Sequence, residues 1–214
     1  MINLRVDIVS DVVCPWCVVG YRQLDEALQQ TGATADIHWH PFELNPQMPE
    51  SGQNLTEHIR EKYGMNATQS EENRKKLTEI GETLGFSFAY NDSSRMVNTF
   101  KAHQLLHWAG IHDKEHELKQ TLFSRYFTDQ EDIHDLAVLT ASAESVGLDK
   151  QEAQKVLESE TYASIVRQRE AHWTDQGIRG VPAMIVNEKY LLSGAQGVEN
   201  YSQMIKQLQD EQSA

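Results

Sequence analysis

Short runs in which apolar residues alternate with polar ones, or follow one another without a break, occur near both ends of the chain. Four segments have this strand-like pattern: 4–9, 36–40, 183–186 and 190–193. The first becomes apolar-rich toward its end, which is typical of a central strand. The last two are separated by three residues that fit a turn, so they predict a hairpin.

Helical periodicity fills the middle of the chain. About six helices are predicted there: 55–63, 69–84, 95–109, 113–127, 133–146 with 149–158, and 161–176. Asn54-x-x-Glu57 and Thr68-x-x-Glu71 fit capping boxes at the starts of the first two. One more helix follows the first strand, and another closes the chain over 198–209.

This order of elements predicts an α/β protein. A sheet of three to four strands is interrupted by a large all-helical insertion. We expect the sheet-forming part to comprise residues 1–48 and 177–214, and the insertion to comprise residues 49–176.

Composition narrows the class of protein. The chain has 214 residues, of which 39% are hydrophobic and 24% charged, as in ordinary globular proteins. Its net charge of −13 repels phosphate backbones, so we expect no nucleic-acid partner. No apolar run is long enough for a membrane span, and residues 1–14 do not have the pattern of an export signal. We therefore expect a cytoplasmic protein with no membrane partner. The acidic surface neither requires nor forbids a dimer.

The two cysteines stand three positions apart, where the first strand ends and a helix begins. A helix N-terminus favours a thiolate, so Cys14 is the expected nucleophile in thiol–disulfide exchange. Cys17, one turn on, could attack a mixed disulfide at Cys14 and release the product. Pro15 fits the first helical turn, where no N–H is needed. A zinc half-site is the alternative, but a structural zinc ion needs four ligands and no second Cys-x-x-Cys exists.

A second motif, Gly180-Val181-Pro182, stands directly before the third predicted strand. A proline there would interrupt the strand unless it lies at its start. Proline peptide bonds adopt the cis form far more readily than others do, so both a cis bond and a trans bond at the strand start fit the sequence.

Together these motifs resemble the thioredoxin superfamily, and more narrowly the cytoplasmic FrnE-like branch of the DsbA family. The resemblance rests on six stretches: 11–17, 39–46, 98–103, 122–127, 180–182 and 193–196. It implies a thioredoxin-like fold with a helical insertion domain, and a disulfide oxidoreductase or isomerase activity. It also implies that Cys14 is an exposed nucleophile, that Cys17 resolves the mixed disulfide, and that a cis bond before Pro182 faces the sulfurs.

The resemblance further implies that the loop at Gly180 and Val181 offers backbone groups to an extended substrate. We expect Pro15 and an exposed Trp16 to contribute to substrate binding, because the indole could contact an apolar side chain of a partner. The dipeptide between the cysteines, Pro15-Trp16, affects the stability of the thiolate and therefore the reduction potential of the thiol pair. The sequence does not indicate whether the pair oxidises or reduces its substrates.

Three other residues are candidate auxiliaries. Asp11 could relay a proton during resolution or cap the helix entry, and the sequence favours neither role. His40 could approach the thiols, although local packing is the more common role of such a histidine. Glu43 could accept a proton near the sheet, or be a solvated loop carboxylate.

We therefore expect a thiol–disulfide oxidoreductase that exchanges disulfides with proteins or small thiols such as glutathione. No bound organic cofactor is expected, since the chain has no glycine-rich phosphate loop, and no metal site is expected. One alternative is an enzyme like kappa-class glutathione transferases or 2-hydroxychromene-2-carboxylate isomerase, but similar proteins usually carry serine at the position of Cys14. The other is a non-catalytic redox-sensing or metal-binding module.

Overall fold

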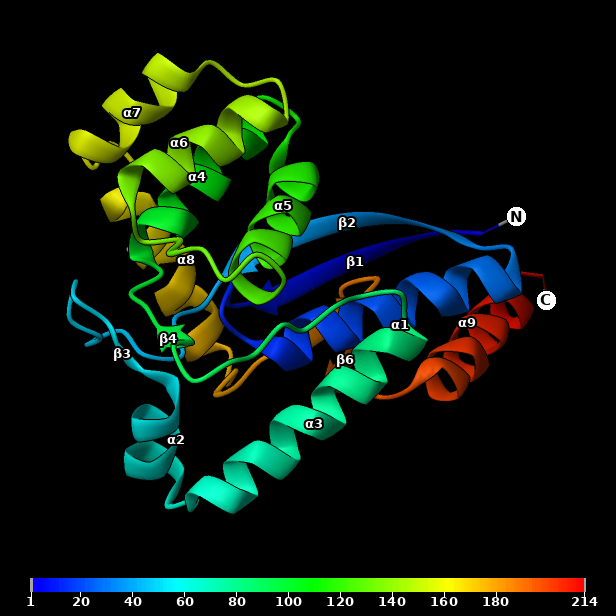
Figure 1. The fold of residues 1–214 in the computed structure, drawn as a ribbon. Coiled ribbons are helices and arrows are strands. Elements are labelled where there is room, and N and C mark those ends of the chain that lie inside the picture. The colour runs from blue at the N-terminus through cyan, green and yellow to red at the C-terminus, as the bar shows by residue number, and fades with distance from the viewer. Residues whose placement is uncertain (1, 214) are drawn as a thin grey trace.

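A computed structural model describes residues 2–213, with side chains up to residue 211. Met1 and Ala214, the ends of the predicted sheet-forming part, lie outside the described residues. The strands are β1 (Asn3–Ser10), β2 (Thr34–Pro41), β3 (Gln53–Asn54), β4 (Arg95–Met96), β5 (Ala183–Val186) and β6 (Tyr190–Ser193). The helices are α1 (Pro15–Thr31), α2 (Leu55–Tyr63), α3 (Ala67–Thr83), α4 (Phe100–Ile111), α5 (Glu115–Phe127), α6 (Leu136–Ser145), α7 (Lys150–Glu158), α8 (Ala163–Asp175) and α9 (Val198–Ser213) (Figure 1).

The four predicted strands form one sheet in the order β2-β1-β5-β6. The strands β1 and β2 are parallel, from Asn3 opposite Thr34 to Ser10 opposite Pro41. The strand β5 runs antiparallel to β1, and β6 completes the predicted hairpin. Because β5 runs antiparallel to β1, with Ala183 opposite Val9, β5 starts where β1 ends. The loop that precedes β5 and the turn that follows β1 therefore lie at the same end of these two strands.

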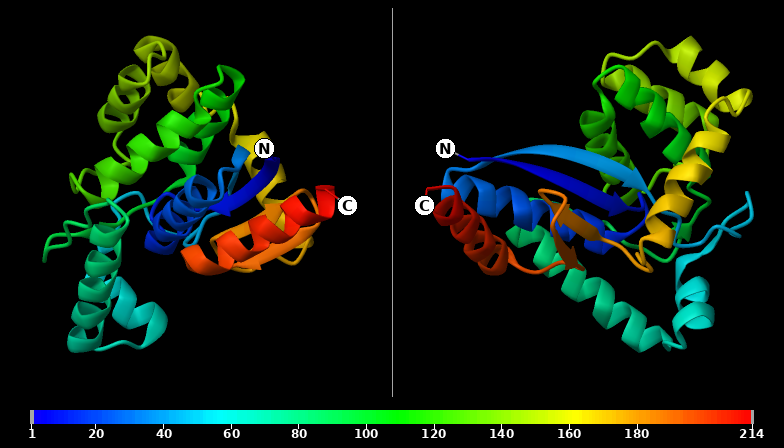
Figure 2. Two further views of the ribbon diagram at one scale, coloured as in Figure 1. Left: turned by 90° about the vertical axis from the view of Figure 1, so that its right-hand side faces the viewer. Right: turned by 180° about the vertical axis from the view of Figure 1, so that it is seen from behind.

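The two faces of this sheet differ. Helices α1 and α9 pack together on one face, against the buried side chains of Leu4, Val6 and Ile8 (Figure 1). Full burial of each such side chain stabilises the fold by about 1.5–3 kcal/mol. Asp7 and Val9 point to the opposite face, which α8 covers only near β2. Seen from behind, α8 leads down to the hairpin β5–β6 (Figure 2).

The segment between β2 and β5 contains seven helices, α2 to α8, where about six were predicted. We call residues 55–175 the helical block. The predicted helix at 95–109 begins only at Phe100, because residues 95–96 pair with residues 53–54 as β3 and β4. The insertion is therefore helical apart from this pair of two-residue strands. The domain boundaries at residues 48 and 176 stay a prediction.

One of the two predicted helix starts is correct. The side chain of Asn54 accepts hydrogen bonds from the backbone N–H groups of Thr56 and Glu57. The second capping box is formed by Asn66 and Gln69 and not by Thr68 and Glu71, so α3 begins two residues earlier than the pattern suggested. None of the helices within residues 2–213 has the length and apolar character that a membrane span requires.

Candidate active site

Cys14 is the residue that precedes the first turn of α1. Its backbone is extended (φ −91°, ψ 110°), and the N–H of Cys17 donates a hydrogen bond of 3.0 Å to the Cys14 carbonyl. Pro15 occupies the start of the helix, where a missing N–H costs nothing. The two cysteines lie one turn apart, as the sequence predicts, and both are free thiols.

Cys14, the expected nucleophile, is covered. Cys14 is only 3% exposed and Cys17 is fully buried, so the expectation of an exposed nucleophile is wrong. Surrounding residues cover the sulfur, and this covering was not visible in the local pattern. Trp16 is 44% exposed, as predicted, and offers an aromatic surface beside the covered thiol.

The loop before β5 lies over the cysteine. The bond between Val181 and Pro182 is cis, and the Cys14 thiol donates a hydrogen bond of 3.6 Å to the Val181 carbonyl. Pro182 packs onto α1 at Gly20, where a Cβ atom would lie 3.2 Å from the proline Cγ. A glycine in α1 therefore lets the loop approach the helix closely. Gly180 is exposed, with open space around it.

Asp11 lies beneath the cysteines and does not cap α1. One carboxylate oxygen accepts a 2.7 Å hydrogen bond from the N–H of Leu44, and the other accepts a 3.2 Å hydrogen bond from Nε2 of His103. Burial alone would raise the pKa of Asp11. The hydrogen bond and charge of His103, the Leu44 N–H and the charge of Lys119 outweigh burial and hold this pKa below its ordinary value. The helix-cap interpretation is wrong, and Asp11 is an ionised group in the interior.

Lys119 on α5 is a charged group near the thiols that sequence reasoning missed. It is 1% exposed, and its ammonium nitrogen lies 5.3 Å from the ring centre of Trp39 and 5.1 Å from that of Phe123. Burial lowers the pKa of Lys119 to about 8, although Cys17, Asp11, Glu115 and Cys14 act to raise it. The available signal was its position on the apolar stripe of α5, beside Leu118 and Leu122.

The Cys17 thiol is hard to ionise in these surroundings. Burial raises its pKa well above the ordinary value, and the neighbouring Cys14 sulfur raises it further. The charge of Lys119 and the backbone N–H of Asp11 act in the opposite direction. The site therefore contains one cation, supplied by the helical block, that favours the Cys17 thiolate.

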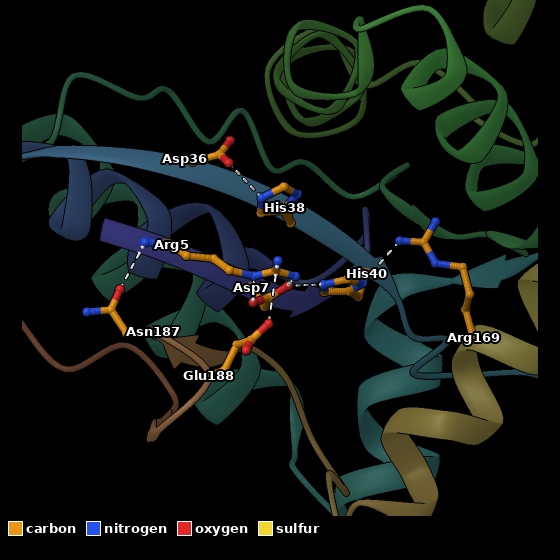
Figure 3. Close-up of polar contacts among 8 residues, drawn as sticks. All are labelled: Arg5, Asp7, Asp36, His38, His40, Arg169, Asn187 and Glu188. Atoms are coloured by element: carbon orange, nitrogen blue, oxygen red, sulfur yellow. Dashed lines mark hydrogen bonds and ion pairs between the residues drawn. The ribbon is translucent and has the colours of Figure 1, made fainter. Parts of the chain in front are cut away.

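His40 is engaged on the opposite face of the sheet. Its Nε2 lies 2.8 Å from the Asp7 carboxylate, and its Nδ1 lies 3.0 Å from the Arg169 guanidinium (Figure 3). Its ring packs against that of Trp173 at a tilt of 49°, with the ring centres 4.6 Å apart. Burial, followed by the charge of Arg169, lowers the pKa of His40 to about 4 despite Asp7. Both ring nitrogens are occupied by partners other than the cysteines, so the predicted approach of His40 to the thiols is not seen.

A groove opens beside His40, between α8 and the hairpin β5–β6. We call it the back groove; its volume is about 650 Å³. It is lined by Arg5, Asp7, His40, Ile165, Gln168, Arg169, His172, Trp173, Gln176, Ile178, Ile185, Glu188 and Leu191.

Glu43 is not a solvated loop carboxylate. Its side chain is 2% exposed and forms an ion pair with Arg167, whose guanidinium lies 3.7 Å from the ring centre of Phe100. Its second oxygen has no hydrogen-bond partner among residues 2–213. The contacts of Glu43 tie the end of β2 to the helical block, which favours a structural role.

Metal binding finds no support at the histidines. Within the described part of the chain, no three histidine, cysteine or carboxylate side chains gather as metal ligands would. His103 contacts Asp11, and His116 contacts Trp39 and Tyr21.

Comparison with known proteins agrees with this geometry. The family described as DSBA-like thioredoxin domain matches residues 5–206. The uncharacterized protein YwbO of Bacillus subtilis (strain 168) is 28% identical over 211 residues, covering 98% of each chain.

Solved structures extend the likeness to the fold. A "probable DsbA oxidoreductase", SCO1869 of Streptomyces coelicolor, has a TM-score of 0.89 at 30% identity, with 97% of this chain and 91% of that chain covered. The structure of a 2-hydroxychromene-2-carboxylate isomerase shares the fold alone, with a TM-score of 0.70 at 14% identity over 98% of both chains. The expected thioredoxin-like fold with a helical insertion is therefore confirmed. With the family match spanning nearly its whole length, the chain belongs to the DsbA-like thioredoxin family.

Proposed function

We propose that the protein exchanges disulfides through Cys14 and Cys17. The observation that carries the proposal is the position of the Cys14 sulfur, at the N-terminus of α1 and in contact with the Val181 carbonyl beside the cis bond to Pro182. A thiolate there attacks one sulfur of a substrate disulfide, forms a mixed disulfide with it, and releases the other sulfur as a thiolate. Cys17 then loses its proton and attacks the Cys14 sulfur. The products are the Cys14–Cys17 disulfide and the second substrate thiolate, and the reverse sequence oxidises a dithiol.

The charged groups beneath the thiols support the second step. The Cys17 thiolate forms in the interior, where an isolated anion is costly. The ammonium group of Lys119 offsets that charge, and Asp11 keeps the lysine itself compensated. These charges lower the free-energy cost of forming the buried Cys17 thiolate during the second step.

Substrate binding falls to the surface around the covered sulfur. In this proposal an extended substrate pairs with the backbone of Gly180 and Val181, and its apolar side chain contacts Pro15 and the exposed ring of Trp16. Glutathione disulfide and protein disulfides are both substrates of this chemistry. The reaction draws electrons from thiols and needs no bound organic cofactor. Membership of the FrnE-like branch and a cytoplasmic location are parts of the same proposal.

Trapping the intermediate tests the proposal. With glutathione disulfide as the probe, the Cys17→Ala variant should accumulate a mixed disulfide on Cys14 that mass spectrometry detects. The Cys14→Ala variant should form none, and the wild type should end as the internal disulfide. Failure of Cys17→Ala to form any adduct at Cys14 contradicts the proposal.

The rival enzyme class makes a different prediction. A glutathione-transferase or isomerase activity uses a hydroxyl where Cys14 stands, so Cys14→Ser should keep or gain conjugation of glutathione to an electrophile while thiol exchange is lost. We expect the reverse, with no conjugation in either form. A binding module would instead bind its partner stoichiometrically and show no turnover with dithiothreitol and insulin.

A further inference from the structure

The back groove has features that the thiol chemistry does not use. Its volume of about 650 Å³ falls within the range of about 300–1,000 Å³ that is typical of small-molecule sites. Asp7 and Ile185 belong to its lining, and both point away from the sheet face on which α1 packs. A substrate held at Cys14 therefore leaves the groove free for a second molecule.

The apolar lining of the groove is partly open to solvent. It comprises Ile165 and Trp173 from α8, Ile178 from the loop after α8, Ile185 from β5 and Leu191 from β6. Ile165 is 39% exposed and Leu191 is 55% exposed, and both belong to the few large hydrophobic side chains that the described chain leaves exposed. Exposed apolar side chains that gather in one groove mark a binding surface. The groove is therefore suited to an apolar body.

Arg169 is the cation on the α8 side of the groove, and neutral groups hold it. Its guanidinium donates hydrogen bonds to Nδ1 of His107 and Nδ1 of His40, each at 3.0 Å, and to the Trp39 carbonyl at 2.9 Å (Figure 3). Each ring accepts a proton through Nδ1, so both imidazoles are neutral. Burial raises the pKa of Glu115 and the charge of Arg169 opposes that rise, but the two form no ion pair among residues 2–211.

Other arginines of the protein show what Arg169 lacks. Arg5, Arg125 and Arg167 each form an ion pair with a carboxylate. A guanidinium has five N–H donors, and the three hydrogen bonds of Arg169 use three of them. Within the described part of the chain, no carboxylate pairs with this cation. A carboxylate from outside the protein can take that place, and charge-assisted hydrogen bonds of this kind are strong.

The side of the groove formed by β1 and the hairpin is already paired. There Arg5 forms ion pairs with Asp7 at 2.8 Å and with Glu188 at 3.5 Å, and Asp7 also accepts a hydrogen bond from Nε2 of His40 (Figure 3). Two carboxylates share one guanidinium, so this side carries one net negative charge. A second anionic group on a ligand would be repelled here. The charges of the groove therefore select an acid with a single carboxylate.

We propose that the back groove binds a small organic acid that has one carboxylate and an apolar body. The carboxylate accepts hydrogen bonds from the free N–H groups of Arg169, and the apolar body lies against Trp173, Ile185 and Leu191. Aromatic and aliphatic monocarboxylates form this class. Binding makes no covalent bond, and none of the groove residues belongs to the thiol motif. The site is thus separate from the disulfide exchange proposed above.

Isothermal titration calorimetry with three matched probes tests the ligand class on the unaltered protein. We expect saturable binding of 2-naphthoate at low salt. Its neutral analogue 2-naphthamide should bind at least about tenfold more weakly, because it lacks the charge that Arg169 recognises. Naphthalene-2,6-dicarboxylate should also bind more weakly than 2-naphthoate, because its second carboxylate meets the negative side of the groove.

Substitutions in the groove test the assigned contacts. Arg169→Met should weaken 2-naphthoate binding at least about tenfold. Arg60→Met is the matched control, because Arg60 is exposed on α2 and does not line the groove, and it should bind as the wild type does. Leu191→Glu and Leu191→Gln provide a second pair at an exposed position that the fold does not need. The added negative charge should weaken binding about twofold more than the amide at low salt.

Methyl NMR locates the bound probe. The ring of 2-naphthoate should shift the methyl signals of Ile178, Ile185 and Leu191, and should leave those of Val18 and Val19 on α1 in place. Binding should also persist in Cys14→Ser, because the thiol takes no part in it.

Several outcomes overturn the inference. They are the absence of saturable 2-naphthoate binding, equal binding of 2-naphthoate and 2-naphthamide, and equal effects of Arg169→Met and Arg60→Met. Loss of binding in Cys14→Ser would assign the probe to the thiol site and overturn it as well. If Arg169→Met does not fold, equal binding by Leu191→Glu and Leu191→Gln overturns it. None of these measurements depends on adduct formation at Cys14, so failure of the groove and failure of the proposed function are separate results.

Discussion

Two aspartates four positions apart, Asp7 within β1 and Asp11 just after it, each pair with a histidine. The surroundings of the two pairs differ. Asp7 is bound by His40 at 2.8 Å and by Arg5, whose side chain is half exposed at the rim of the back groove. Asp11 is bound by His103 at 3.2 Å, and both side chains of that pair are at most 2% exposed. The pKa of each carboxyl is lowered against the effect of burial.

The difference shows what the helical block adds to the sheet. Asp7 and two of its neighbours, Arg5 and His40, come from β1 and β2, so the sheet itself supplies most of that cluster. Asp11 depends on α4 for His103 and on α5 for the charge of Lys119. The helical block therefore places charged groups under the thiols, where the sheet alone provides apolar side chains.

The largest expected effect comes from neutralising Asp11. Asp11→Asn should lower the free energy of unfolding by about 3 kcal/mol, because it leaves buried partners without their counter-charge. Asp7→Asn should cost about 1 kcal/mol, since Arg5 can turn to solvent. Urea denaturation of both variants measures the difference. If both variants lose the same free energy of unfolding, burial does not distinguish the two pairs, and the comparison drawn from the structure is wrong.

A smaller effect should appear in the pH dependence of stability. The pKa of His40 is about 4 in the folded protein and near 6.5 in the unfolded chain. Between these values the unfolded chain binds a proton that the folded protein does not, so stability falls as the pH is lowered from 6.5 to 4. The loss from this group approaches about 3 kcal/mol at the acid end.

Thermal or urea unfolding across this pH range tests the assignment to His40. His40→Gln should show a flatter profile than the wild type. His38→Gln is the matched control, because His38 lies on the same face of β2 but its side chain is 39% exposed, beside Asp36, against 14% for His40. An equally steep profile in His40→Gln would place the pH dependence elsewhere.

The smallest effect is expected at Arg5. The Arg5 side chain is half exposed and Glu188 is exposed, although Asp7 is buried. Arg5→Gln should therefore change the free energy of unfolding by less than about 1 kcal/mol. The same change should raise the pKa of Asp7, because Arg5 donates a hydrogen bond to that carboxylate. Carboxyl NMR titration would detect the rise, and an unmoved Asp7 would show that His40 alone holds the carboxylate ionised.

Local pattern was enough to predict the strands and the thiol motif. The four sheet strands follow alternation and apolar runs within a few residues. Cys14, Pro15 and Cys17 lie together at the start of α1. The family resemblance extended the prediction from single elements to the whole fold, because the stretches that support the resemblance are spread from residue 11 to residue 196. The start of α4 was misplaced because residues 95–96 pair with residues 53–54, and no local window contains both.

The electrostatics of the site could not be predicted in the same way. His103 reaches Asp11 across 92 residues, so no local window of the sequence contains both. Lys119 is buried beside Trp39, and lysines are rarely buried, so its sequence position alone did not single it out. The covering of Cys14 likewise depends on a loop near the other end of the chain, and pattern reasoning does not register such contacts.

The hydrogen bond between Cys14 and Val181 joins residues 167 positions apart, which has a consequence for biosynthesis. On the ribosome, the cysteine helix emerges long before the loop that covers it, and all of α2 to α8 must be translated in between. During that interval the nascent chain presents two unshielded thiols. The protein acquires its mature protection from stray oxidants only when its last quarter has joined the sheet.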